Sequence, residues 1–187
     1  MNICVYGASS SALDASYIEA VEELGAKMAL RGHGLVFGAG SQGLMGAAAR
    51  GMARNKGTII GVAPHFFNTG DILFTECTVL HLTETMRERK QYMEENSDAF
   101  VVAPGGIGTF DEFFEILTLR FLGRHQKPIA IFNVNGYYNE LIAFLRKSVK
   151  EKFLSEAIFD VLFVSDQVDE ILNYLEDQHG ASSSDGQ

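Results

Sequence analysis

The sequence is poor in several features that would assign it to a large class of proteins. It has only two cysteines, Cys4 and Cys77, which lie in predicted strands and lack the spacing of metal ligands. This usage favours a reduced cytoplasmic location over secretion. Met1 is followed by the polar Asn2 and then by a predicted strand, so we expect no signal peptide.

Long apolar runs and dense basic blocks are missing as well. No apolar run reaches the roughly 18 residues that a membrane-spanning helix needs, so we expect no contact with a membrane. The net charge is −9, with 15 Lys and Arg against 24 Asp and Glu. Because no stretch concentrates the positive charge, the sequence argues against a surface for nucleic acid or anionic lipid.

Several catalytic patterns are also absent. The five histidines are scattered without paired spacing, which predicts no metal site. No GxSxG elbow and no Cys–His pairing is present, and no lysine lies in a context typical of pyridoxal phosphate. We therefore expect an activity that requires no metal and no organic cofactor.

What the sequence does contain predicts one soluble α/β domain. Its 187 residues are 47% hydrophobic and 21% charged, which suits a single sizeable core. We expect this domain to span residues 1–179. The remaining residues 180–187, GASSSDGQ, lack apolar residues and are predicted to be a disordered tail.

Short apolar runs alternate with helical patterns along the whole domain. The runs predict strands at 2–7, 34–38, 58–63, 77–82, 99–103, 128–133 and 161–164. The patterns between them predict helices at 13–31, 43–55, 84–96, 109–122, 137–152 and 167–178. This alternation predicts a Rossmann-like, doubly wound parallel sheet with helices on both faces. Ligands of such sheets bind beyond the carboxyl ends of the strands.

Two turns beyond these strand ends allow more than one interpretation. In residues 7–11, the hydroxyl of Ser9 suits a phosphate or ribose, but an ordinary loop with a serine N-cap explains it equally. The turn GAGSQGLMG at 38–46 contains GxGxxG, yet the next strand ends without the acidic residue of an NAD site, and no P-loop Lys-Ser/Thr follows. Close packing of helix on sheet and the lining of a nucleotide site both remain open.

The third turn, within PGGIGTFDE at 104–112, is the most informative. It reads as strand, glycine-rich turn and helix start, where backbone N–H groups and the helix dipole form an anion cradle. We expect positive φ angles and close approach at its glycines, Gly105, Gly106 and Gly108. Glu112 then lies one helical turn from a bound phosphate. The alternative is a capping box between Thr109 and Glu112.

Arg89 is a second candidate. It shares the apolar stripe that Met86 and Met93 define on the predicted helix 84–96, so it should point inward. A buried guanidinium needs a partner, since an unpaired buried charge is costly. Arg89 either forms a structural ion pair with a core carboxylate or points into a nucleotide pocket.

PGGIGTFDE and the TMRERK segment at 85–90 together resemble the PGGxGTxxE and ERK motifs of the LONELY GUY family. These are cytokinin riboside 5′-monophosphate phosphoribohydrolases, formerly labelled lysine decarboxylase-like. The resemblance runs through NICVYGASS, GAGSQGLMG, SDAFVVAPGGIGT and KPIAIFNVNGYYNELI and covers about nine-tenths of the chain.

The resemblance implies roles for individual residues. It makes Arg89 and Glu112 catalytic and points to Asp71 as an acidic contact to ribose. Its substrate-binding residues fall on Ser9, Gly40, Gly43, Met45, Lys90, Gly105, Gly106, Ile107, Gly108, Thr109 and Thr118. Lys90 could equally pair with Glu94, four residues on.

The implied reaction is hydrolysis of the N-glycosidic bond of a purine nucleoside 5′-monophosphate, either AMP, as in an AMP nucleosidase, or a cytokinin ribotide. The products are free base and ribose 5-phosphate. A nucleotide-binding or sensor protein without chemistry is the alternative. The presence of Arg89 together with Glu112 favours the enzyme, because a pure binder has no need of both.

The predicted helix 109–122 also points to self-association. Its apolar residues surround the helix rather than form one stripe, whereas a helix that covers only its own sheet needs one apolar face. They are Phe110, Phe113, Phe114, Ile116, Leu117, Leu119, Phe121 and Leu122. We expect the surplus to be buried in a homodimer, as the resemblance also implies.

Overall fold

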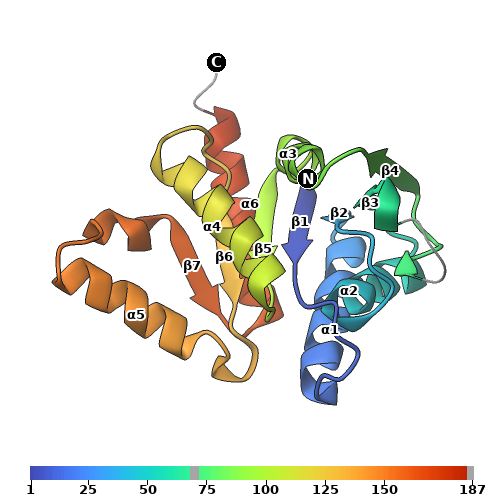
Figure 1. Ribbon diagram of the computed structural model, residues 1–187, viewed down its shortest axis with the longest axis horizontal. Coiled ribbons are helices and arrows are strands. Elements are labelled where there is room, and N and C mark those ends of the chain that lie inside the picture. Colours follow the sequence, from blue (N-terminus) through green and yellow to red (C-terminus); the bar gives the residue numbers. More distant parts are fainter. Residues whose placement is uncertain (68–71, 185–187) are drawn as a thin grey trace.

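The computed structural model describes residues 1–67 and 72–184, and Figure 1 shows its strands and helices. The strands are β1 Asn2–Tyr6, β2 Gly34–Phe37, β3 Ile59–Pro64, β4 Val79–Thr83, β5 Ala99–Val102, β6 Ile129–Phe132 and β7 Leu162–Ser165. The α-helices are α1 Ala15–Leu30, α2 Gly43–Arg54, α3 Met86–Glu95, α4 Ile107–Phe121, α5 Asn139–Lys150 and α6 Val168–Ser184. The alternation of strand and helix confirms the predicted α/β class.

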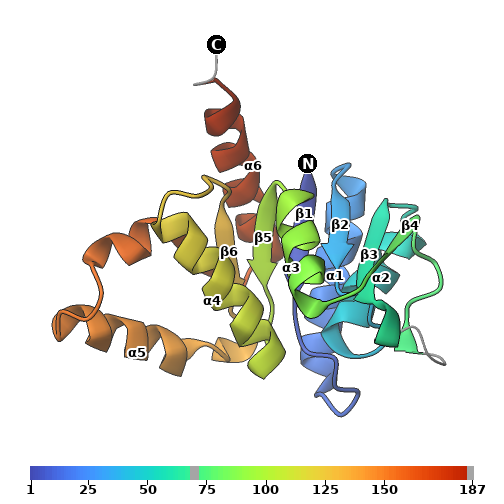
Figure 2. The ribbon, with the colours of Figure 1, turned by 45° about the horizontal axis from the view of Figure 1, so that its top comes forward.

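The strands form one seven-stranded sheet in the order β4-β3-β2-β1-β5-β6-β7, in which every neighbouring pair is parallel. The chain therefore winds outward from β1 to β4 and returns to the other side of β1 with β5. This reversal places a topological switch point between β1 and β5, where doubly wound sheets bind their ligands. Figure 2 shows these two strands side by side.

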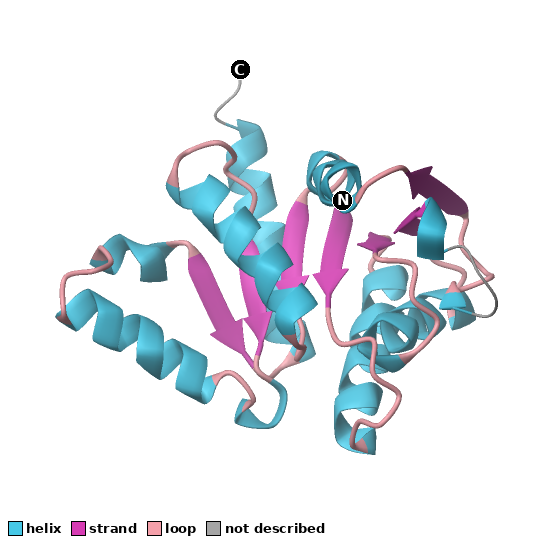
Figure 3. Cartoon of the chain, in the orientation of Figure 1, coloured by secondary structure: helices cyan, strands magenta, loops and turns pink. Residues whose placement is uncertain are grey.

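The helices cover both faces of the sheet, as the cartoon of Figure 3 shows. Along β1, Ile3 and Val5 face a core shared with α1, α2 and α6, whereas Cys4 and Tyr6 face a core shared with α3, α4 and α5. This division follows from the two-residue period of a strand. The result is the doubly wound, three-layer arrangement that the sequence predicts.

The C-terminal end differs from its prediction. Helix α6 runs to Ser184, so residues 180–184 continue the helix instead of starting the disordered tail predicted at 180–187. No proline interrupts this stretch, and Ala and Ser are tolerated in a helix. Residues 185–187 lie outside the described part of the chain.

Candidate active site

The switch point brings together the turns that follow β1 and β5. The amide of Ala8 donates to the carbonyl of Pro104 at 3.0 Å, which joins the two turns directly. The turn after β5, Pro104–Thr109, is called the PGGIGT turn from here on. It leads straight into α4, whose N-cap is Gly106.

The N-terminus of α4 carries no capping side chain among the described residues. The alternative interpretation, a capping box of Thr109 and Glu112, is therefore wrong. The same T-x-x-E pattern does form a capping box at the start of α3, between Thr85 and Glu88. The first N–H groups of α4 thus remain available to an anion, with the positive end of the helix dipole behind them.

The glycines of the PGGIGT turn do not have the backbone conformation that was expected of them. None of the three has a positive φ angle. Gly105 is required because a Cβ there would overlap the side chain of the buried Thr109. Gly106 and Gly108 are exposed, and a Cβ at either would meet no atom within 4 Å. The turn is tight on the protein side and open on the outer side, which a phosphate could approach.

Arg89 and Glu112 form a buried pair beside this turn. Arg89 is only 6% exposed, and its Nη1 donates to Glu112 Oε1 at 2.7 Å. Its Nε donates to the carbonyl of Val62 on β3 at 3.2 Å. A Cβ at Gly38 would overlap Arg89 Nη2, so a glycine is needed where the guanidinium lies. The inward orientation predicted for Arg89 is confirmed, and its core partner is Glu112.

Burial dominates the electrostatics of this pair. It raises the pKa of the Glu112 carboxyl above its ordinary value, although Arg89 acts in the opposite direction. Burial also raises the pKa of the nearby Cys4 thiol to about 12 and that of the Tyr6 hydroxyl well above its ordinary value, so both stay neutral. Glu112 and Arg89 therefore interact in surroundings of low polarity, where charges act strongly on one another.

Lys90 has different neighbours from those considered in the sequence. Its Nζ contacts the carboxylates of Asp111 at 3.0 Å and Glu115 at 2.5 Å, both on α4. These bonds raise its pKa against the opposing effect of burial. Lys90 thus ties α3 to α4 and does not rely on a pair with Glu94.

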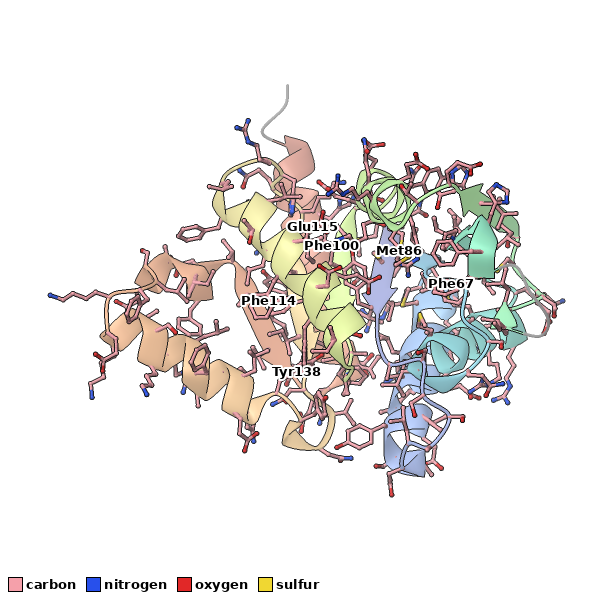
Figure 4. All side chains as sticks on the ribbon, viewed as in Figure 1. Phe67, Met86, Phe100, Phe114, Glu115 and Tyr138 are labelled. Atoms are coloured by element: carbon pink, nitrogen blue, oxygen red, sulfur yellow. The ribbon has the colours of Figure 1, made fainter. Side chains whose placement is uncertain are left out.

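Thr118 does not share a face of α4 with Glu112. The two residues are six positions apart, which corresponds to roughly 120° around a helix axis. Thr118 is exposed and lines an open groove of about 580 Å³ on the outer side of α4, together with Lys90 and Phe114. Figure 4 labels Phe114 and Glu115 on this helix.

The GAGSQGLMG turn is engaged in close packing. Gly43 has φ +60°, and a Cβ there would lie too close to the carbonyl of Ala8. That carbonyl accepts the amide of Leu44 at 2.8 Å, so the N-terminus of α2 is occupied by the first loop. Met45 covers Gly40, where a Cβ would be 2.8 Å from its Cε. The packing interpretation of this turn is favoured.

Of two further predicted contacts, only one can be placed. Ser9 lies exposed in the loop after β1, next to the switch point. Asp71 lies outside the described residues. A cavity of about 1160 Å³ lies elsewhere, between α5 and β7, and is lined by none of the predicted site residues.

Sequence reasoning missed two tyrosines that bind the PGGIGT turn and the end of β5. Tyr137 donates its hydroxyl to the carbonyl of Gly105 at 2.7 Å, and Tyr138 donates to that of Ala103 at 2.8 Å. Both were predicted only as helix residues. The signal was present, because β5 and β6 were predicted parallel strands and the loop after β6 ends at the same edge of the sheet.

Within residues 1–67 and 72–184, no cluster of three or more His, Cys, Asp or Glu side chains could hold a metal ion. In the same part of the chain, no helix is both long and apolar enough to cross a membrane.

Fold and site together define a Rossmann-like α/β protein with a buried arginine–glutamate pair beside an open helix N-terminus. Residues 45–175 match a family model described as "Possible lysine decarboxylase". Cytokinin riboside 5′-monophosphate phosphoribohydrolase LOG1 of Arabidopsis thaliana is 37% identical over 175 residues, which cover 94% of this chain and 82% of that protein. The probable enzyme LOGL9 of Oryza sativa subsp. japonica is 40% identical over 152 residues, 81% of this chain and 67% of that protein. The chain belongs to this LOG family, as the motifs predicted.

Solved structures agree on the fold. The Moco carrier protein of Chlamydomonas reinhardtii matches with a TM-score of 0.71 at 20% identity, over 96% of this chain and 98% of that one. A molybdenum cofactor binding protein of Rippkaea orientalis matches with a TM-score of 0.70 at 18% identity, over 94% of each chain. At such identities the likeness concerns the fold alone.

Proposed function

We propose that this protein hydrolyses the N-glycosidic bond of purine nucleoside 5′-monophosphates to free base and ribose 5-phosphate. The observation that carries the proposal is the 2.7 Å contact between Arg89 and Glu112 beside the uncapped N-terminus of α4. Relatives at 37% and 40% identity carry the corresponding phosphoribohydrolase name.

Glu112 suits the chemical step. Cleavage of a glycosidic bond builds positive charge on the ribose, and a carboxylate beside C1′ stabilises that charge and can activate a water molecule. Because Glu112 is buried, its charge acts through a medium of low polarity. The Arg89 guanidinium is a planar fork of N–H donors and is therefore assigned to positioning substrate and to stabilising charge on the departing base.

The PGGIGT turn is assigned to the 5′-phosphate. The N–H groups at its helix N-terminus suit an anion, and binding there supplies energy remote from the reacting bond. Gly105, Gly106, Ile107, Gly108 and Thr109 form this subsite. Contacts to the rest of the substrate are proposed from Ser9, Gly40, Gly43, Met45, Lys90 and Thr118. Either AMP or a cytokinin ribotide serves as substrate.

We further propose that the protein is a cytoplasmic homodimer. Helix α4 leaves apolar side chains uncovered, with Ile107 82%, Phe114 40% and Leu122 65% exposed. A two-fold axis would bury this strip against its own copy. Both cysteines are free, which suits a reducing compartment.

The test is release of base by the purified protein, followed by HPLC. AMP and an N6-substituted AMP are compared with adenosine, which has no 5′-phosphate. We expect equimolar base and ribose 5-phosphate from at least one nucleotide and a far lower kcat/KM for adenosine. Nucleotide binding without release of base would instead support the sensor alternative, and equal kcat/KM for AMP and adenosine would remove the role given to the PGGIGT turn.

A further inference from the structure

Each backbone carbonyl from Ala103 to Gly106 accepts a hydrogen bond from a different partner. Tyr138 donates to Ala103 and Tyr137 donates to Gly105 through their hydroxyls. The amide of Ala8 donates to Pro104, and that of Phe110 donates to Gly106. The carbonyl oxygens, which would repel a phosphate, are thereby all directed at protein donors.

The direction of one carbonyl determines the direction of one amide. A peptide unit is planar and trans, so its C=O and N–H point in opposite directions. The carbonyl of Gly105 and the N–H of Gly106 belong to the same unit. A unit between two glycines has no Cβ on either side to oppose its rotation, and the Tyr137 hydroxyl bond at 2.7 Å restrains its carbonyl directly.

We propose that Tyr137 is a positioning residue, which fixes the Gly105–Gly106 peptide so that the Gly106 N–H faces the 5′-phosphate. The inference rests on the proposed function and adds a residue to its phosphate subsite. Tyr137 acts only through the turn and is not itself a catalytic residue.

The ring of Tyr137 is held in place by two neighbouring aromatic rings. It packs edge-on against Tyr17 of α1 at 6.2 Å and against Tyr138 at 4.9 Å between ring centroids. The backbone of Tyr138 is fixed in turn, because its amide donates to Asn133 Oδ1 at 2.7 Å. Figure 4 shows Tyr138 beside the first turn of α4. These contacts therefore fix the ring from which the Tyr137 hydroxyl donates to Gly105.

Tyr138 provides a matched control. It also donates a hydroxyl bond to this segment, and it is more deeply buried than Tyr137. The peptide that it fixes, Ala103–Pro104, ends in a proline nitrogen and carries no N–H. Loss of the Tyr138 hydroxyl should therefore reduce stability without changing an amide donor of the phosphate subsite.

The experiment compares Tyr137→Phe and Tyr138→Phe in the full chain. KM and kcat for AMP are measured by base release, the Kd for AMP and ribose 5-phosphate by calorimetry, and the Tm by thermal unfolding. For Tyr137→Phe we expect KM and both Kd values to rise about 10-fold with kcat within about twofold, since a lost ground-state contact raises KM. For Tyr138→Phe we expect a lower Tm with KM and Kd unchanged.

A wild-type KM and Kd in Tyr137→Phe would overturn the inference, as would an equal rise in both variants. If Tyr138→Phe does not fold, the values for Tyr137→Phe against wild type still decide, because Tyr137 is 41% exposed and Phe keeps its ring contacts. Wild-type protein that binds AMP without cleaving it refutes the proposed reaction alone, and the Kd values then judge the inference. Wild-type protein that binds neither ligand overturns both.

Discussion

At the residue scale, the pairing of Arg89 with Glu112 is hard to explain by stability. Two charges taken out of water lose hydration that their mutual attraction only partly returns, and apolar residues of similar volume often stabilise a core better. This pair is nevertheless buried at the switch point, with the guanidinium also bound to a β3 carbonyl and fitted against Gly38. The chemistry proposed for the pair gives a reason for the arrangement that packing does not.

Gly38→Ala should impair the enzyme although Gly38 belongs to neither side chain of the Arg89–Glu112 pair. The added methyl group takes the space of Arg89 Nη2, so the guanidinium must leave its position against Glu112. We expect kcat/KM for AMP to fall on the order of 10²-fold, as for other misplacements of about 1 Å. Gly180→Ala in α6, where a Cβ meets nothing within 4 Å, is the control. Wild-type kinetics in Gly38→Ala would mean that the position of Arg89 is unimportant.

The raised pKa of Glu112 predicts the pH dependence. Since the role proposed for Glu112 requires an ionised carboxylate, kcat/KM should rise with pH through a value above 4.5, the ordinary pKa of the group. Stability changes in the opposite direction. The contribution of Glu112 is fully present below about 4.5 and is lost as pH rises through the raised pKa. A pH profile of kcat/KM whose acid limb lies at or below 4.5 would contradict this assignment.

At the element scale, periodicity predicts the strands and helices because each buries one kind of face. Periodicity predicts less well how the ends of the helices are capped. Thr85-x-x-Glu88 and Thr109-x-x-Glu112 are the same pattern, yet only the first forms a capping box. The second does not, because α4 already begins at Ile107 and Thr109 lies inside the helix. Glu112 instead binds Arg89 of α3, a helix that local sequence cannot place. The positive φ angles predicted for the PGGIGT glycines are wrong for a similar reason, because the backbone conformation of a turn depends on what surrounds it.

The contribution of the α3 capping box to stability should be measurable with a single substitution. Thr85 accepts the amide of Glu88 at 3.1 Å, so Thr85→Ala removes one cap bond. We expect the free energy of unfolding to fall by about 1 kcal/mol, the usual effect of losing an N-cap. Urea denaturation measures it, with Thr118→Ala on the exposed face of α4 as a control expected to change stability by less than about 0.5 kcal/mol. Equal values for the two variants would argue against the cap.

At the scale of the whole molecule, the strand order was the part that the sequence could not provide. Alternation predicts a parallel sheet, but only the order β4-β3-β2-β1-β5-β6-β7 places the loop after β1 against the PGGIGT turn. Assembly was the second global feature. Surplus apolar residues on α4 suggested it, and several of them are indeed exposed in the single chain.

The homodimer can be tested by light scattering at micromolar concentration. We expect a mass twice the 20.5 kDa of one chain. Phe114→Asp, which places a charge in the exposed strip of α4, should yield monomers, because burying an unpaired charge is costly. Phe153→Asp changes a residue that is 84% exposed and lies off α4, and should leave the dimer intact. A fully active wild-type monomer would refute the homodimer.

The most direct test of the whole account is Glu112→Gln, measured for base release from the nucleotide that the wild-type protein cleaves. Glutamine keeps the volume and can accept the bond from Arg89, but it has no charge. Glu95→Gln, on the exposed side of α3, is the control. We predict a fall in kcat of roughly 10²–10⁴-fold with the Kd for nucleotide preserved. Turnover near the wild-type rate in Glu112→Gln would contradict the assignment of Glu112 to the chemical step.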